Sequence, residues 1–132
     1  MCKFLEKYSP YIFAVLRIIA GLMFACHGSG KLFGFPGENP AAPLVSLMGL
    51  GGVIEFFGGL LIAFGFFASY AAFIASGMMA VAYFMAHFPK GFLPIVNRGE
   101  LAVLYCFIFL LIAAQGPGVW SIDSLIKKCR AK

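Results

Sequence analysis

Four long apolar stretches, each close to the length of a membrane-spanning helix, dominate this sequence of 132 residues. They cover approximately residues 11–27, 44–67, 69–88 and 100–115. Crossing the hydrocarbon core of a bilayer takes about 20 mostly apolar residues in an α-helix. Helix-starting and helix-stopping residues stand at the ends of these stretches, namely Pro10, Pro43, Pro89 and Gly116-Pro117-Gly118. We therefore predict an all-α integral membrane protein, a four-helix bundle in the lipid bilayer.

Composition supports lipid as the main solvent of this chain. Hydrophobic residues make up 62% of the sequence and charged residues 11%, whereas soluble domains are about a quarter charged. The length predicts a single transmembrane domain over residues 1–132. The net charge of +5 is spread along the chain and accompanies no nucleic-acid-binding motif. We predict no nucleic-acid partner.

The positions of the lysines and arginines predict which loops face the cytoplasm, because cytoplasmic loops carry the excess of positive charge. An even number of spans puts both termini on one side. That side holds Lys3, Lys7, Lys127, Lys128, Arg130 and Lys132, and the other holds Lys31, Lys90 and Arg98. We predict that both termini are cytoplasmic (N-in, C-in), with two longer loops outside, at 28–43 and 89–99.

Two charged residues lie deep within the predicted spans. Arg17 interrupts the first span and Glu55 the second, and a lone charge at the bilayer centre costs at least a few kcal/mol, about 2.5–3.5 on insertion scales. Counting from span ends at His27 and Leu44 places both near the midplane. We predict that Arg17 and Glu55 form a buried ion pair. Such a pair either only fixes helix register or forms a proton or substrate site.

A second set of polar residues falls at the predicted outer ends of the spans: His27, Lys31, His87, Asn97 and Glu100. If these ends converge, the set forms an outer-face polar pocket, in which the histidines exchange protons near neutral pH. Alternatively, each residue simply sits in the headgroup zone, with Glu100 stabilised at a helix N-terminus. Two histidines and a carboxylate also suit a metal, whereas the spacing of the four cysteines fits no metal motif. We predict no metal site and assign no catalytic residue.

Several of these residues, taken together, resemble the pattern of the DoxX family of small bacterial membrane proteins. The matching features are Arg17, Gly28 and Lys31; Glu55, Gly58-Gly59 and Gly65; His87; Asn97-Arg98-Gly99-Glu100; and Gly116-Pro117-Gly118 before Ser121-Ile122-Asp123. The resemblance implies a four-helix, multi-pass protein of the bacterial inner membrane. The family is named after a subunit linked to thiosulfate:quinone oxidoreductase, and other members are associated with redox stress complexes. The four cysteines form no recognisable motif here, so that substrate is not transferred to this chain.

Three functional hypotheses follow. In the first, the chain is the membrane subunit of a redox system, with a redox partner protein and with quinone as the one cofactor to consider, although no cofactor motif is evident. In the second, it transports a small solute or protons, and four spans are few enough that a homo-oligomer is expected. In the third, it is a structural or assembly protein whose buried charges only lock the helices, and whether it is an enzyme stays open.

Overall fold

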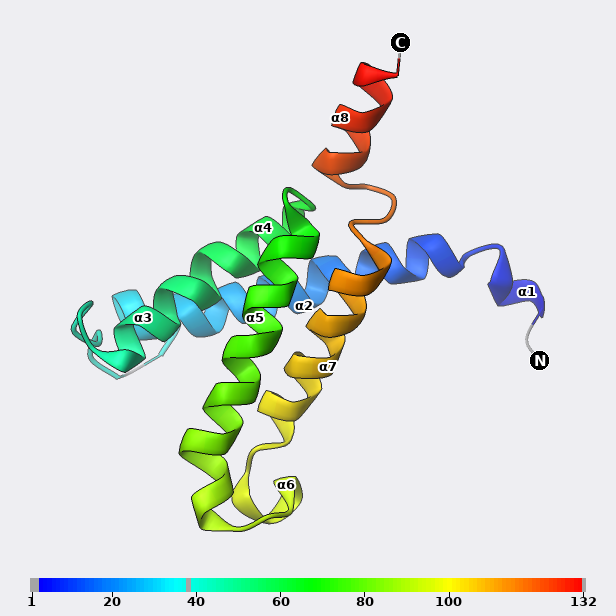
Figure 1. The fold of residues 1–132 in the computed structure, drawn as a ribbon. Coiled ribbons are helices and arrows are strands. Elements are labelled where there is room, and N and C mark those ends of the chain that lie inside the picture. The colour runs from blue at the N-terminus through cyan, green and yellow to red at the C-terminus, as the bar shows by residue number, and fades with distance from the viewer. Residues whose placement is uncertain (1–2, 38, 132) are drawn as a thin grey trace.

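The computed structural model describes residues 3–37 and 39–131, and all regular structure within them is helical. Figure 1 shows the chain as a set of long helices joined by loops, with the two termini well apart. The elements in chain order are α1 (Lys3–Glu6), α2 (Ser9–Phe33), α3 (Leu47–Val53), η1 (Ile54–Gly58), α4 (Gly59–Phe64), α5 (Ala68–Ala82), η2 (Tyr83–His87), η3 (Phe88–Lys90), α6 (Pro94–Asn97), α7 (Glu100–Gln115) and α8 (Ile122–Arg130).

Three continuous helical segments are long and apolar enough to cross a membrane. They are Ser9–Phe33, Leu47–Phe64 and Ala68–Lys90, and Glu100–Gln115 is a shorter apolar helix. Within the second and third segments the α-helix passes through a π-helical turn, η1 and η2 respectively. π-Helical turns are rare overall, and those that occur are often found at functional sites. The turns η1 and η2 therefore indicate where a functional site should be sought.

The first two helices have ends different from those we predicted. α2 continues beyond residue 27 to Phe33 and stops where Gly34 adopts a left-handed conformation, with φ of 72°. The second helical segment starts at Leu47 rather than at residue 44, because Ser46 is its N-cap and accepts a hydrogen bond from the Gly49 N–H at 3.0 Å. From the sequence we ended the first helix at residue 27, where polar residues follow, and did not identify Ser46 as a cap.

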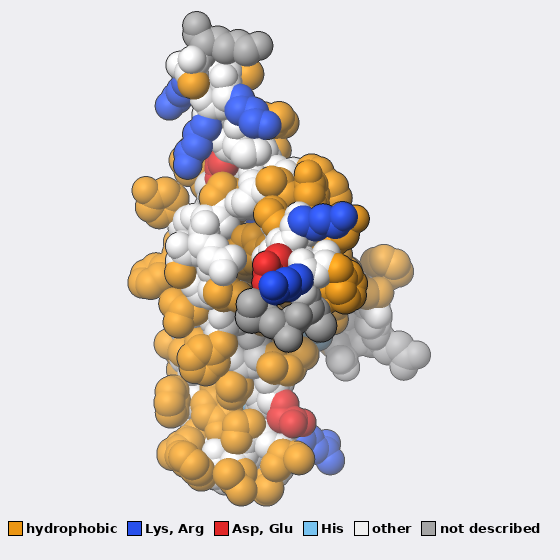
Figure 2. Space-filling view, turned by 90° about the vertical axis from the view of Figure 1, so that its right-hand side faces the viewer, with side chains coloured by type: hydrophobic (Ala, Val, Ile, Leu, Met, Phe, Trp, Pro, Cys, Tyr) orange, Lys and Arg blue, Asp and Glu red, His pale blue; other side chains and the backbone are white. Residues whose placement is uncertain are grey.

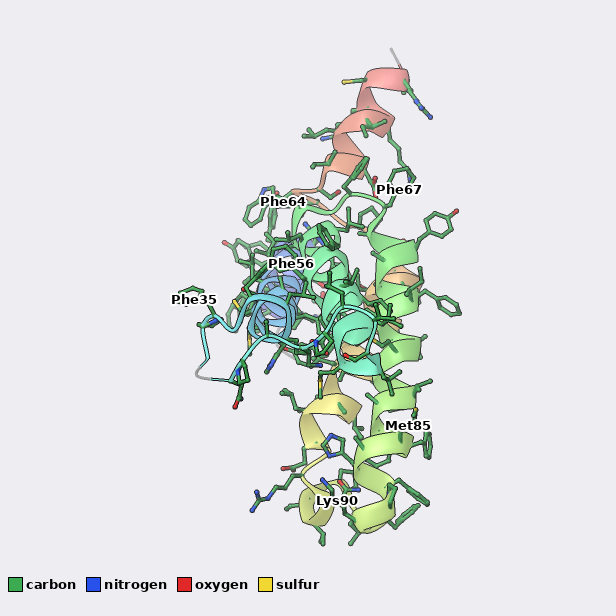
Figure 3. All side chains as sticks on the ribbon, turned by 90° about the vertical axis from the view of Figure 1, so that its left-hand side faces the viewer. Phe35, Phe56, Phe64, Phe67, Met85 and Lys90 are labelled. Carbon is green, nitrogen blue, oxygen red and sulfur yellow. The ribbon has the colours of Figure 1, made fainter. Side chains whose placement is uncertain are left out.

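The four long helices form two antiparallel pairs. α2 packs along α3, η1 and α4, and α5 packs along α7. The pairs cross steeply: Figure 3 views α2 and α3–α4 nearly end-on while α5 and α7 run across the view. The structure therefore shows two crossed helix pairs and not four helices packed side by side in one bundle. The chain turns sharply between the pairs at residues 65–67, where Gly65 and Phe67 both have positive φ.

A core of small and aromatic side chains joins the two pairs where they cross. Alanines on α5 pack against α7, and Phe24 of α2 contacts the rings of α7 residues. Outside this core, large apolar side chains cover most of the surface, and Figure 2 shows this cover over the body of the molecule. Such a surface suits lipid rather than water. The buried core consists of Ala20, Phe24, Ile62, Ala71, Ala72, Ala75, Met79, Ala102, Tyr105, Phe109 and Ile112.

Glycines bring the backbones of α2 and α4 into direct contact. A Cβ atom built on Gly59 would lie 2.5 Å from the backbone nitrogen of Ala25, and one on Gly21 would lie 2.6 Å from that of Ala63. Further along α2, a Cβ atom on Gly28 would collide with the backbone of Phe56. Small residues permit this kind of close approach in membrane helices. Because of these contacts, α2 and the second helical segment can pack in only one register.

Gly58 and Gly59 offer a matched test of this contact, because a Cβ atom on Gly58 would meet nothing within 4 Å. We expect Gly59→Ala to lower the free energy of unfolding by about 1–3 kcal/mol through overpacking. Gly58→Ala should not lower it, because the added methyl group meets nothing and alanine favours a helix over glycine by up to about 1 kcal/mol. Reversible unfolding of the two purified variants in detergent and SDS mixtures measures both. Equal effects of the two substitutions would contradict the packing described here.

Candidate functional site

Glu55 lies in the π-helical turn η1 and is almost completely buried. Its partner is Lys31 on α2, whose Nζ atom lies 2.6 Å from Glu55 Oε1. The lysine side chain is 33% exposed and that of the glutamate 6%, so the pair reaches from the packed interior toward the surface. The second carboxylate oxygen, Oε2, is buried and has no hydrogen-bond partner among the described residues.

A cavity of about 200 Å³ opens beside this ion pair, between the two helix pairs. Its polar wall comes from α2, η1, η2 and the loop before α7, and its apolar wall from α2, α5 and α7. Histidines, a lysine, an arginine and a carboxylate thus face one small space. We call this space the polar cavity; its lining residues are Phe24, His27, Lys31, Glu55, Met79, His87, Arg98, Leu101, Ala102 and Tyr105.

Tyr105 contributes a buried hydroxyl group to the polar cavity. Its ring stacks on Phe109 at 5.3 Å and meets His27 edge-on at 6.1 Å. Its hydroxyl has no hydrogen-bond partner among the described residues, although buried tyrosine hydroxyls usually find one. Sequence reasoning missed this residue. A lone phenol in an apolar span was the available signal, because its hydroxyl needs a partner that lipid does not supply.

His87 reaches the polar cavity from the end of η2. Its Nδ1 atom lies 3.1 Å from the Asn97 carbonyl oxygen, and its ring stacks on Tyr83. Asn97 itself does not line the cavity. Its buried side-chain amide donates to the carbonyl of Gly91 at 2.7 Å and accepts from the Gly99 N–H at 2.8 Å. Asn97 therefore holds the loop that positions His87.

The five residues of the predicted outer-face pocket thus divide into two groups. His27, Lys31 and His87 line the polar cavity, whereas Asn97 and Glu100 do not. Glu100 is exposed in the first turn of α7, where a carboxylate is favoured by the helix dipole. Arg98, which we had counted only as a loop charge, lines the cavity instead.

The predicted pair between Arg17 and Glu55 does not form, because the guanidinium binds carbonyl oxygens. Arg17 is fully buried, and its Nη1 atom donates to the carbonyls of Ile62 at 2.7 Å and Ala63 at 2.6 Å. Its Nη2 atom donates to that of Trp120 at 2.8 Å. Carbonyls in the last turn of a helix lack the usual i+4 partner, and the Ile62 carbonyl accepts a further bond from the Gly65 N–H at 3.1 Å, so Arg17 adds to the C-terminal cap of α4.

Helix ends explain why the prediction of this pair was wrong. In the structure, 16 residues separate Arg17 from the end of α2 at Phe33, but only 8 separate the start of α3 at Leu47 from Glu55. At about 1.5 Å per residue, Arg17 lies about 24 Å and Glu55 about 12 Å from the helix ends that the loop between α2 and α3 joins. The two charges are therefore at different depths, and each finds a different partner.

The segment 116–123 completes the cap around Arg17. Gly116, Gly118 and Trp120 adopt positive φ, which folds the chain back so that the Trp120 carbonyl reaches Arg17. The Asp123 carboxylate then accepts hydrogen bonds from the N–H groups of Phe67 and Ala68 at 3.1 and 3.2 Å, at the start of α5. This segment therefore joins the end of α4 to the start of α5 and has a structural role.

These features define a small, helical, multi-pass membrane protein with a polar cavity between two helix pairs. The family model described as DoxX matches residues 12–88, more than half of the chain. The chain belongs to the DoxX family, which confirms the resemblance that the motifs predicted. The match includes Arg17, Lys31, Glu55 and His87, whereas Tyr105 lies beyond it.

Two bacterial relatives align with most of the chain. An uncharacterized protein of Haemophilus influenzae Rd is 45% identical over 127 residues, which cover 91% of this chain and 94% of the relative. The inner membrane protein YqjF of Escherichia coli K12 is 32% identical over 123 residues, covering 86% and 91%. No solved structure matches the chain. The chain is a multi-pass protein of the bacterial inner membrane.

A double-mutant cycle tests the two environments of the buried charges. We expect Arg17→Met to lower the free energy of unfolding by about 3 kcal/mol, because it removes the hydrogen bonds donated to the Ala63 and Trp120 carbonyls. Its effect should add to that of Glu55→Gln within about 0.5 kcal/mol, as for distant sites. Lys31→Met and Glu55→Gln should instead be coupled. Unfolding of the single and double variants in detergent measures both coupling energies. A coupling energy above about 1 kcal/mol between Arg17 and Glu55 would contradict the structure and indicate that these two residues form an ion pair.

Proposed function

We propose that the chain is the membrane subunit of a redox system and that its polar cavity binds the head group of a quinone. One observation carries this proposal. The polar cavity shares Leu101 and Tyr105 with a second cavity of about 160 Å³, whose remaining walls are apolar side chains of α2 and α7. A polar space that adjoins an apolar groove suits a ligand with a polar ring and a hydrocarbon tail. The groove is lined by Leu16, Ile19, Ala20, Met23, Leu101, Leu104, Tyr105 and Ile108.

The chemistry of the polar cavity fits the two oxygens of a quinone ring. Tyr105 and Arg98 offer donors for a carbonyl oxygen, and the free Oε2 atom of Glu55 offers an acceptor for the hydroxyl of a quinol. At about 200 Å³ the cavity is smaller than the ~300–1,000 Å³ typical of drug-sized ligands. It therefore suits one ring, with the tail outside in the apolar groove.

Histidines at the cavity allow proton exchange with the outer face. Reduction of a quinone to a quinol consumes two electrons and two protons. In our proposal a redox partner protein supplies the electrons, and His27 and His87, whose imidazole rings can both accept and donate a proton, deliver the protons. His27 is exposed and His87 half-buried at the cavity wall, so both stand between the cavity and the outer solvent.

The proposed topology keeps both termini in the cytoplasm. Along the diagonal of Figure 1, the termini lie toward the upper right and the two long loops toward the lower left. A membrane normal along this diagonal lets both helix pairs cross with a tilt, and membrane helices tilt by up to about 40°. The excess of lysine and arginine near the termini supports the same orientation. The polar cavity then opens outward.

Proton or solute transport is the second candidate. A buried carboxylate oxygen that has no partner in the described part of the chain, beside two histidines, also suits a proton path. The backbone contact of Gly21 with Ala63 and of Gly59 with Ala25 weighs against it, because it closes the space between α2 and α4 below Glu55. Uptake into liposomes that is lost in Glu55→Gln would favour transport over quinone binding. A purely structural role predicts neither uptake nor binding.

Quinone binding is tested with the full chain in nanodiscs and a short-tailed quinone analogue. We expect saturable binding, which Tyr105→Phe weakens about three- to tenfold through loss of one hydrogen bond. Tyr70→Phe is the matched control, because Tyr70 is 74% exposed on α5 and lines no cavity described here. Glu55→Gln, with the exposed Glu100→Gln as its control, forms a second pair of matched variants. Unsaturable binding, together with quinone-free native lipid extracts, would exclude the proposal.

A further inference from the structure

An open groove of about 760 Å³ lies at the opposite end of the molecule from the polar cavity, between α2, α4 and α8. Ile18 and Leu22 of α2 and Phe64 of α4 form an apolar wall. Leu125 and Lys128 of α8 line the groove from the other side. We call it the α8 groove. Its apolar wall is continuous with the lipid-facing surface, since Leu22 and Phe64 are 46% and 61% exposed.

α8 is an amphipathic helix that carries positive charge without acidic partners. Ile122, Leu125 and Ile126 follow i, i+3, i+4 spacing on one face, and Lys127, Lys128 and Arg130 occupy the last turn. No buried residue belongs to this helix. Within residues 3–37 and 39–131, none of the three cations forms an ion pair. Figure 2 shows basic side chains gathered at the α8 end of the molecule.

The acidic residue nearest in sequence is already engaged. The Asp123 carboxylate accepts the N–H groups of Phe67 and Ala68, so it caps α5 and does not neutralise the end of α8. Tyr11 and Trp120 also line the α8 groove, with their rings 5.3 Å apart. Tyrosine and tryptophan are enriched at the headgroup level of membranes. This pair therefore indicates that the groove lies where lipid head groups meet acyl chains.

We propose that the α8 groove binds one anionic phospholipid of the surrounding bilayer. The phosphate lies against Lys128, with Lys127 and Arg130 contributing to the local field, and an acyl chain lies along Ile18, Leu22 and Phe64. Charge selects the occupant, because unpaired lysines and arginines beside a membrane attract anionic lipids. A second copy of the chain would bring the same three cations together and be repelled. The proposal is independent of quinone binding.

Native mass spectrometry of the full chain in detergent tests this site, with dioleoyl phosphatidylglycerol as the probe and dioleoyl phosphatidylcholine as the comparison. We expect one phosphatidylglycerol to be retained with about tenfold preference. Lys128→Gln should reduce its affinity about fivefold, the effect of one lysine near an anionic surface. Lys127→Gln is the matched control, because Lys127 is the neighbouring residue and does not line the groove; its effect should be smaller.

A steric variant tests the acyl-chain half of the site. Leu22→Trp fills the groove and should also lower lipid retention, whereas Ile12→Trp, at an exposed position on another face of the same helix, should not. Equal retention of the two lipids would overturn the proposal. So would equal effects of Lys127→Gln and Lys128→Gln, which would indicate a diffuse charge effect without a site. A lipid-free dimer that is lost in Leu22→Trp would assign the groove to a second copy of the chain instead.

Discussion

Backbone contact between α2 and the second helical segment is the constraint on which the rest of the molecule depends. Gly21, Gly28 and Gly59 allow the two helices to touch without intervening side chains, and a contact of this kind permits one register only. That register places Lys31 opposite Glu55 and Arg17 beside the last carbonyls of α4. The polar cavity and the cap around Arg17 are thus two consequences of the same helix pairing.

The two charged side chains within the apolar helices, Glu55 and Arg17, are stabilised in two different ways. Glu55 has a cationic partner, one free oxygen and an adjoining cavity. Arg17 has no carboxylate partner in its hydrogen-bond set and is surrounded by carbonyl oxygens at helix ends. A guanidinium has five donors in a fixed geometry, which suits several carbonyls at once. The first arrangement leaves an acceptor beside a cavity, whereas the second engages both terminal nitrogens of Arg17 and leaves its buried Nε atom without a partner among the described residues.

Much of this organisation could be predicted from the sequence, because long apolar runs and their Pro and Gly boundaries report directly on membrane-spanning helices. The stripe of Arg17, Gly21, Phe24, Gly28 and Lys31 was visible as i, i+3/i+4 spacing, and in the structure these residues share the inward face of α2. The partner of each charge was not predictable, since it depends on where the helices end. An error of six residues at the end of α2 was enough to pair Arg17 with the wrong group. The crossing of the two helix pairs depends on three-dimensional packing that the sequence pattern does not report.

The π-helical turns have a consequence for how such a cavity can arise. Glu55 lies within η1 and His87 ends η2, so each helix pair contributes a cavity side chain from a widened turn. A π-helical turn accommodates one extra residue while the helix continues on both sides. In a regular α-helix one inserted residue would rotate the following helix face by about 100°, whereas a π-helical turn takes up the extra residue locally. A single-codon insertion absorbed in this way therefore changes which side chain the turn presents to the interior, leaving the packed faces on both sides, the loops and the topology of the protein as they were.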